Sequence, residues 1–232
     1  MTTLSIRRFA SRAELDAALA ARLGRALADH ADAAAPPALM LSGGTTPMAA
    51  YRALGAQRPT PAAGLRILFT DERYVPASST ESNYHQSRPL LDALALPAAQ
   101  LLRVRTELPL DQAAADYERR LAELLQSGAG VGLGLLGLGA DGHTASLFGA
   151  PDLERARGHL AIAVQRPDGR SAVSVTPGFL ARVREPVFVV AGAGKEEAVR
   201  RLTAHDAQLT AWVAVQGCAS VELWLDQAAA GA

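Results

Sequence analysis

The chain has 232 residues, 49% of them hydrophobic, so it is long enough to bury a sizeable core and to fold alone. Its 23 basic and 23 acidic side chains balance, which excludes the overall positive charge with which proteins hold nucleic acid or an anionic membrane. The single cysteine, Cys218, excludes an internal disulfide, and we find neither a secretory leader nor an apolar run of about 18 residues, so we expect a cytoplasmic protein.

The N-terminal part of the sequence predicts a helix, a buried strand and a tight turn in succession. Residues 11–32 begin with a serine and, three residues later, a glutamate, and leucines then recur every fourth residue, which indicates a capped amphipathic helix. The apolar run 39–41 indicates a buried strand that ends in a Ser-Gly-Gly turn. A second helix is expected directly after it, with Thr46 as its N-cap and Pro47 as its first residue.

The rest of the chain alternates short apolar runs with helical patterns. The runs that indicate strands are 65–69, 131–138, 173–175, 187–191 and 221–225. Helical patterns fall between them over residues 111–126 and 195–202. Such alternation predicts a Rossmann-like three-layer α/β/α fold with a mostly parallel central sheet, in one domain over residues 1–232. Ligands of such sheets bind beyond the carboxyl ends of the strands.

The first polar cluster follows the strand over 39–41 and consists of Ser42, Gly43, Gly44 and Thr45. Glycines let the backbone approach an anion closely, and the free N–H groups of a following helix point at it. The hydroxyl groups add further donors without a charged side chain. The pattern therefore predicts a phosphate cradle, although the same residues also occur as a plain connection before a capped helix.

The second cluster, Asp71, Glu72 and Arg73, follows the strand over 65–69. Adjacent residues of an extended segment point to opposite sides, so we expect one carboxylate to face the site and the other to support it. Arg73 is a candidate for binding a carboxylate or phosphate through two hydrogen bonds. The alternative is a surface arginine that pairs with a neighbouring acid.

The third cluster lies in the glycine-rich turn after 131–138 and presents Asp141 and His143. Its glycines match the dinucleotide-binding pattern in two overlapping frames, which shows how weak that pattern is here. Imidazole is the side chain whose ordinary pKa lies nearest neutrality, so His143 is the candidate for taking a proton from water. Asp141 is the candidate for fixing the imidazole tautomer. We interpret three other histidines as structural: His30, His159 and His205.

A fourth cluster places Lys195 after two glycines at the start of a predicted helix. It is not a P-loop, because Glu196 stands where a serine or threonine would bind magnesium. Lys195 is a candidate point charge for phosphate, with a solvated surface lysine as the alternative. The sequence contains no nucleophile elbow, no His-Glu-x-x-His motif and no plausible zinc cluster.

Together these clusters resemble the 6-phosphogluconolactonase family. The segments that carry the resemblance are 41–47 with Tyr51, 70–76 with Ser82 and Asn83, and 137–148, in which Asp-Gly-His-Thr-Ala-Ser-Leu-Phe is most diagnostic. The resemblance covers nearly the whole chain. It implies hydrolysis of 6-phospho-D-glucono-1,5-lactone to 6-phosphogluconate in the oxidative pentose phosphate pathway, without a metal or an organic cofactor. The expected partner is therefore a small sugar-phosphate lactone, and we expect a monomer or a weak homo-oligomer.

The resemblance also implies roles for individual residues. It makes His143 the general base, directs the Ser42–Thr45 turn and Lys195 toward the phosphate, and places Asp71 and Arg73 beside the sugar. Members of the family usually carry an arginine where this chain has Ala172, so Arg170 is the expected substitute, and both Arg73 and Arg170 stay candidates for the phosphate. The Pro-Ala-Ser expected near residues 209–212 is also absent.

Two rival functions are weighed against the lactonase. Glucosamine-6-phosphate deaminases are similar in fold and share the glycine-rich phosphate turn, but their histidine motif continues with an acidic residue, whereas this chain continues with residues 144–148. A non-catalytic sugar-phosphate sensor would need an output element such as a helix-turn-helix, for which the neutral chain has no spare segment.

Overall fold

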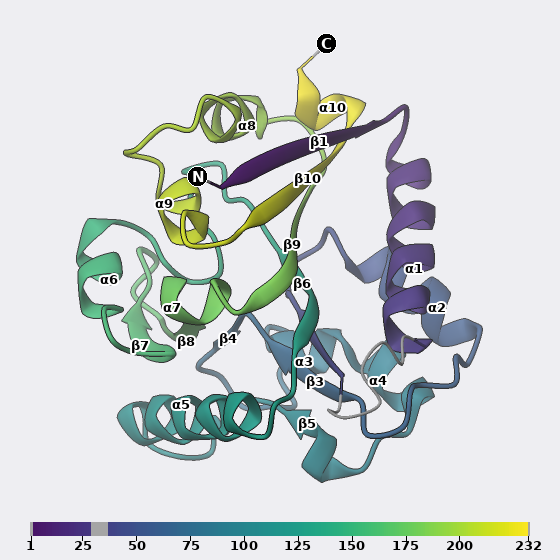
Figure 1. Ribbon diagram of the computed structural model, residues 1–232, viewed down its shortest axis with the longest axis vertical. Helices are drawn as coiled ribbons and strands as arrows, with labels where there is room; N and C mark the ends of the chain where they lie inside the picture. Colours follow the sequence, from purple (N-terminus) through teal and green to yellow (C-terminus); the bar gives the residue numbers. More distant parts are fainter. Residues whose placement is uncertain (1, 29–36, 232) are drawn as a thin grey trace.

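Seven parallel strands form the centre of the computed structural model, which describes residues 2–28 and 37–231 (Figure 1). They lie in the order β1-β10-β9-β6-β2-β3-β5. Their bounds are β1 (Thr3–Phe9), β2 (Ala38–Leu41), β3 (Arg66–Phe69), β5 (Leu101–Leu102), β6 (Val131–Leu136), β9 (Val183–Val190) and β10 (Ser220–Asp226). The larger helices are α1 (Arg12–Ala28), α2 (Met48–Ala56), α4 (Arg88–Leu94), α5 (Leu110–Gln126) and α8 (Glu196–Thr203). The shorter ones are α3 (Asn83–Gln86), α6 (Ala150–Arg155), α7 (Pro177–Leu180), α9 (Thr210–Val215) and α10 (Gln227–Ala230).

Alternate residues of the central strands enter two separate cores, one on each face of the sheet. In β2, Leu39 and Leu41 pack with leucines of α1, α2 and α4, whereas Met40 packs on the other face against α5. In β9, Val187 and Phe188 divide between the two cores in the same way. Because side chains alternate along a strand, a sheet covered on both faces needs apolar residues at every position. The predicted three-layer fold with a parallel sheet is confirmed (Figure 1).

A second, smaller sheet of antiparallel strands lies beside the first. It contains β4 (Asp71–Arg73), β8 (Ser171–Val175) and β7 (Ala161–Gln165), in that order. The chain leaves β3 of the large sheet at Thr70 and enters β4 with the next residue. The run 173–175, which the sequence predicted as a strand, is part of β8 of the small sheet. Its place outside the central sheet was not predicted, because a buried apolar run has the same appearance whichever partner strand it takes.

Of the two helix N-caps predicted from the sequence, the one at α1 is confirmed and the one at α2 is not. At α1, the Ser11 Oγ accepts from the backbone N–H of Glu14 at 3.1 Å, and Glu14 Oε2 accepts from the N–H of Ala10 at 2.8 Å. Residues 29–32 of this predicted helix lie outside the described residues. At α2, Pro47 occupies the N-cap position without a side-chain cap, so Thr46 does not cap the helix as predicted. No described helix has both the length and the apolar character needed to cross a bilayer.

Candidate active site

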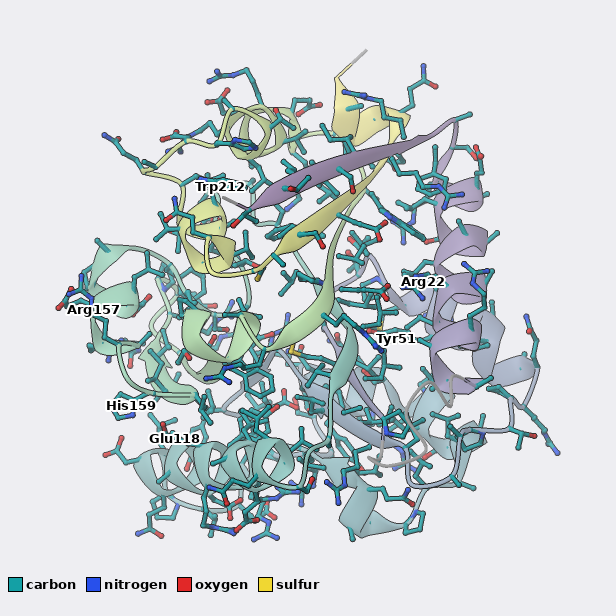
Figure 2. The ribbon with its side chains drawn as sticks, in the orientation of Figure 1. Arg22, Tyr51, Glu118, Arg157, His159 and Trp212 are labelled. Atoms are coloured by element: carbon teal, nitrogen blue, oxygen red, sulfur yellow. The ribbon has the colours of Figure 1, made fainter. Side chains whose placement is uncertain are left out.

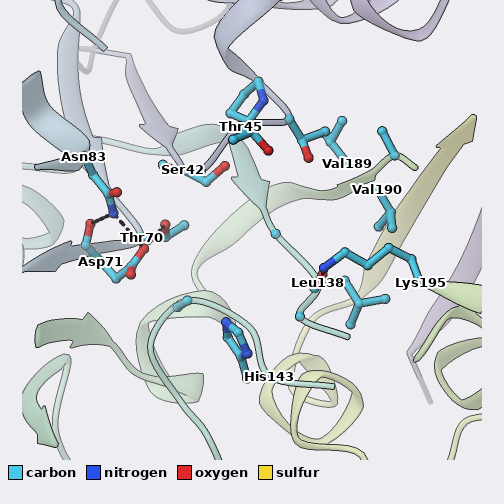
Figure 3. A pocket seen from close by; sticks show the side chains of 18 of the residues that line it. Ser42, Thr45, Thr70, Asp71, Asn83, Leu138, His143, Val189, Val190 and Lys195 are labelled. Carbon is cyan, nitrogen blue, oxygen red and sulfur yellow. Dashed lines mark hydrogen bonds between the residues drawn. The ribbon is translucent and has the colours of Figure 1, made fainter. Parts of the chain in front are cut away.

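The order of the strands places a cavity between the carboxyl ends of β2 and β6. From β2 the chain proceeds through β3 and β5 toward one edge, whereas β6, β9 and β10 follow toward the other. The connections therefore diverge at β2 and β6, which is where open parallel sheets bind ligands. The cavity measures about 310 Å³. Its polar and charged lining comes from Ser42, Thr45, Thr46, Thr70, Asp71, Arg73, Asn83, His143, Arg166 and Lys195 (Figure 3).

The turn after β2, residues 42–45, forms one wall of the cavity and is called the anion turn below. All four of its residues line the cavity. Tyr51, which points from α2 into the interior (Figure 2), donates its hydroxyl to the Ser42 carbonyl at 2.9 Å. Burial raises the pKa of Tyr51, so the phenol keeps the proton that it donates. From outside, Arg12 Nη2 donates to the Thr45 carbonyl at 3.4 Å and to the carbonyl of Thr46, the next residue, at 2.8 Å. Hydrogen bonds to carbonyl groups thus hold the turn at both of its ends.

The turn after β6 presents His143 from the opposite side of the cavity to Ser42 and Thr45 (Figure 3). The Nδ1 atom of His143 lies 2.6 Å from Asp141 Oδ1. The backbone closes the turn, because the N–H of Gly139 donates to the His143 carbonyl at 2.9 Å. A Cβ atom on Gly139 would overlap both His143 Nδ1 and Asp141 Oδ1. The His143–Asp141 contact therefore depends on a glycine at position 139.

Asp141 does not line the cavity but supports the imidazole from behind. Partial burial acts to raise the pKa of Asp141, but the hydrogen bonds and the charge of His143 outweigh it, so the pKa lies below its ordinary value. Asp141 is consequently ionised near neutral pH, and it accepts a hydrogen bond from the protonated Nδ1 of His143. This leaves Nε2 of His143 as the nitrogen with a free lone pair.

The ring of Phe148 packs beside the imidazole, with ring centroids 4.5 Å apart. Between the two residues the chain passes through Ala145, whose φ of +50° lies in the left-handed region, which costs about 1–2 kcal/mol for a residue with a Cβ atom. Buried hydrogen bonds hold its neighbours. Thr144 Oγ1 donates to the Gly137 carbonyl at 2.8 Å, and Ser146 Oγ donates to Asp71 Oδ2 at 2.6 Å.

The acidic pair of β4 divides as the sequence predicted, with Asp71 at the cavity and Glu72 behind it. Besides the Ser146 contact, Asp71 accepts from Thr70 Oγ1 at 3.0 Å and from Asn83 Nδ2 at 3.2 Å. Asp71 is thus a buried carboxylate held by three uncharged donors. Glu72 accepts from Ser82 Oγ and from several backbone N–H groups of the 82–84 turn. Burial raises the pKa of Glu72, and these hydrogen bonds oppose that rise.

Three cationic side chains line the cavity, although the whole chain carries no net charge. Arg73 also donates to the Glu81 carbonyl at 2.8 Å, and Lys195 Nζ donates to the Leu138 carbonyl at 2.9 Å. The third cation, Arg166, was missed by the sequence analysis. Its guanidinium carbon lies 5.4 Å from the centre of the Phe148 ring, a cation–π arrangement.

Arg170, which the sequence offered as a substitute for the family arginine missing at position 172, does not line this cavity. Its Nη1 atom donates to Glu81 Oε1 at 2.5 Å on an exposed part of the surface. Arg166 and Arg170 face each other across the β7–β8 hairpin, where the Arg166 N–H donates to the Arg170 carbonyl. Both arginines lie at the same end of this hairpin. Their positions in the sequence do not reveal which of the two points into the cavity. The position of Ala172 is buried and pairs with Arg73 across the small sheet.

The turn that carries Lys195 is anchored by a buried carboxylate at the end of β10. Asp226 accepts from the N–H of Gly192 at 3.1 Å and from the N–H of Ala229 at 2.8 Å. It therefore caps α10 and holds the start of the Lys195 turn with the same side chain. The 209–212 segment supports the histidine turn in a similar way, since the N–H of Ala211 donates to the Gly142 carbonyl at 2.9 Å.

The other described histidines lie outside the cavity. His159 faces Glu118 of α5, with its Nδ1 atom 3.1 Å from Oε1 (Figure 2). His205 stacks on Trp212 at 4.1 Å between ring centroids. His30 lies outside the described residues. Within 2–28 and 37–231, no group of three or more His, Cys, Asp or Glu side chains is arranged to hold a metal ion.

Comparison with known proteins gives consistent matches over most of the chain. The family model described as glucosamine-6-phosphate isomerases/6-phosphogluconolactonase matches residues 10–222. A 6-phosphogluconolactonase of Nostoc is 36% identical over 205 residues, which are 84% of this chain and 83% of the relative. The human 6-phosphogluconolactonase is 35% identical over 84% of this chain and 79% of its own length. The solved structure of 6-phosphogluconolactonase from Trypanosoma brucei superposes with a TM-score of 0.84 at 25% identity, covering 99% of this chain and 98% of that one.

Proposed function

The chain belongs to the glucosamine-6-phosphate isomerase/6-phosphogluconolactonase family, and we propose that it is the lactonase, which hydrolyses 6-phospho-D-glucono-1,5-lactone to 6-phosphogluconate. The observation that carries the proposal is the shared cavity, in which the anion turn lies opposite His143, with Asp141 behind the imidazole and Lys195 also in the lining. A substrate with a phosphate at one end and an ester at the other needs these two features at the two ends of one site.

In the proposed complex the phosphate lies against the anion turn, where the backbone N–H groups and hydroxyls of residues 42–45 donate to it. Lys195, which also lines the cavity, supplies a positive charge for the phosphate. The sugar ring extends toward Asp71, whose remaining acceptor site on Oδ2 accepts from a ring hydroxyl, and toward Arg73. Arg166 takes the place that the sequence assigned to Arg170, because it is the arginine of that hairpin whose side chain lines the cavity.

The hydrolytic step follows from the tautomer of His143. Nε2 takes a proton from a water molecule, and the water oxygen forms a bond to the lactone carbonyl carbon while Asp141 stabilises the imidazolium. Arginine donors near the carbonyl stabilise the oxyanion that develops. The tetrahedral intermediate then collapses, the bond between C1 and the ring oxygen breaks, and the imidazolium returns its proton to that oxygen. A general base of this kind contributes about 10²- to 10⁴-fold to the rate.

The proposal extends to the setting of the enzyme: a cytoplasmic monomer or weak homo-oligomer that acts on a small molecule. Cys218 is buried and its pKa is raised by burial to about 11, so the thiol is a core residue rather than a reactive group.

The test is an acid-release assay on freshly made 6-phosphogluconolactone, with the spontaneous opening of the lactone subtracted. We expect turnover well above the spontaneous rate, and no ammonia from glucosamine 6-phosphate. Ammonia release without lactone turnover would identify the deaminase instead. Binding of 6-phosphogluconate without turnover of either compound would identify a sensor.

A further inference from the structure

A buried amide lies between the anion turn and Asp71 and contacts both. Asn83, the first residue of α3, is 1% exposed and lines the cavity. Its Nδ2 atom donates to the Asp71 carbonyl at 2.8 Å and to Asp71 Oδ1 at 3.2 Å (Figure 3). Because both of these atoms can only accept, the nitrogen of the amide must face Asp71 and its oxygen must face away.

The amide oxygen of Asn83 points at the anion turn and is an acceptor without a donor. Oδ1 is buried and has no hydrogen-bond partner among the described residues. A Cβ atom on Gly43 would overlap Oδ1 and Cγ of Asn83. The amide thus occupies the space that a side chain at position 43 would need. Leaving a buried acceptor unpaired is unfavourable, so other contacts must hold this arrangement in place.

Those contacts come from the backbone and the neighbours of Asn83. Its N–H donates to Glu72 Oε1 at 2.6 Å, and its carbonyl accepts from Ser87 Oγ at 2.9 Å. Glu72 binds Ser82 and Tyr84 on either side of it as well. Both backbone groups of Asn83 and its Nδ2 atom are therefore bound, and a larger residue at position 43 would have to break the Nδ2 contacts to displace the amide.

We propose that Asn83 is a positioning residue that sets the separation between the anion turn and Asp71. It does so by a hydrogen bond on one side and by steric contact with a bare glycine on the other. The inference rests on the proposed function, in which a phosphorylated substrate spans both features. Gly43 and Asn83 then depend on each other, because the asparagine leaves no space for a side chain at position 43. This is a second reason for a glycine there, besides the close approach of the backbone to an anion.

The test is a double-mutant cycle of Gly43→Ala and Asn83→Ala, read from kcat/KM with 6-phosphogluconolactone. In the wild-type background we expect Gly43→Ala to lower kcat/KM about 100-fold, because its methyl group displaces the amide and with it Asp71. In the Asn83→Ala background the same methyl group meets empty space, and we expect it to cost about 3-fold or less. Equal losses in both backgrounds would overturn the proposal.

A second readout separates positioning from loss of stability. Asn83→Ala should lower kcat/KM about tenfold more for the phosphorylated lactone than for unphosphorylated glucono-1,5-lactone, because only the phosphorylated compound uses both features. A variant that is merely destabilised lowers both values by the same factor. Equal losses for the two substrates would therefore contradict the positioning role.

Folding of the same four proteins provides the control. Gly130→Ala is the matched glycine substitution, since a Cβ atom there has no neighbour within 4 Å, and it should leave both activity and unfolding unchanged. One outcome is that Gly43→Ala itself does not fold. In that case, a double variant that folds supports the steric contact between Gly43 and Asn83. A double variant that does not fold, when Asn83→Ala alone does, excludes that contact. The double-mutant cycle can also be read from the free energy of unfolding, which needs no activity. It therefore tests the steric contact between Gly43 and Asn83 even if the wild-type protein shows no lactone turnover and the proposed function fails.

Discussion

The two turns that face each other across the cavity differ in the kinds of residue that form them. The anion turn after β2 carries only glycines and hydroxyl side chains, and its shape is set by what surrounds it: Tyr51, Arg12 and Asn83. The histidine turn after β6 carries a specific pair of side chains, His143 and Asp141, and its own backbone closes around them. In the proposed function, one turn presents its backbone to the phosphate, whereas the other presents the proton-accepting nitrogen of His143. Damage to the first should therefore change binding, and damage to the second should change the chemical step.

The largest effect is expected at His143. His143→Ala removes the proton acceptor and should lower kcat by about 10²- to 10⁴-fold with KM changed by no more than a few-fold. The fold should survive, because Asp141 is the one hydrogen-bond partner of the His143 imidazole among residues 2–28 and 37–231. Steady-state kinetics and a thermal unfolding curve check both points. His159→Ala, which breaks the other histidine–carboxylate contact of the described chain, is the matched control and should keep wild-type activity.

A smaller loss is expected when the histidine turn is distorted rather than emptied. Gly139→Ala adds a methyl group where His143 Nδ1 and Asp141 Oδ1 lie, so the imidazole must move. Because a misplacement of about 1 Å can cost about 10²-fold, we expect kcat to fall by about 10- to 100-fold. Undiminished kcat in this variant would show that the His143–Asp141 contact is not needed for turnover.

Lys195→Met should act on binding rather than on the chemical step. Loss of a charged hydrogen bond worth about 1.5–3 kcal/mol predicts a rise in KM of about 10- to 100-fold for the phosphorylated lactone. Turnover of unphosphorylated glucono-1,5-lactone should be unchanged. Arg170→Met is the comparison, since Arg170 bonds to Glu81 away from the cavity and its loss should leave KM as it is. A larger rise in KM for Arg170→Met would restore the assignment made from the sequence.

The smallest effect concerns Asp141 and pH. Its pKa in the folded protein lies below the ordinary value of about 3.9, so its ionised form stabilises the fold above that pH. This stabilisation is lost as the pH falls through the lower, folded value. We expect Asp141→Asn to weaken the dependence of the free energy of unfolding on pH below about 4, by a small amount because the carboxylate is 56% exposed and screened by solvent. A steeper dependence would contradict the assigned interaction with His143.

How far the sequence predicts the molecule differs between the two sheets. The central strands β2, β3, β6, β9 and β10 are apolar on both faces, and that pattern has one simple interpretation, so strands and the polar clusters that follow them were found together. The edge strand β1 was missed, because it exposes most of its side chains, including Arg7 and Arg8, and lacks an apolar pattern.

The small sheet was beyond the reach of the sequence for a different reason. Its strand β4 pairs with the β7–β8 hairpin, which lies about 100 residues further along the chain, as in the pairing of Asp71 with Ser174. Single-sequence patterns do not contain such pairings. Arg166 enters the cavity only because that sheet aims it there, and Asn83 contacts Gly43 only because Glu72 holds α3 against β4. Side chains at strand ends were therefore predictable, and side chains delivered by long-range pairing were not.

The most direct test of the account is a crystal structure with 6-phosphogluconate bound. We expect the phosphate within hydrogen-bonding distance of residues 42–45 and near Lys195, and the carboxylate carbon, which was the lactone carbonyl, facing Nε2 of His143. A product bound in the reverse direction, or bound outside the cavity between β2 and β6, would contradict the assignment of anion binding and proton transfer to the two turns.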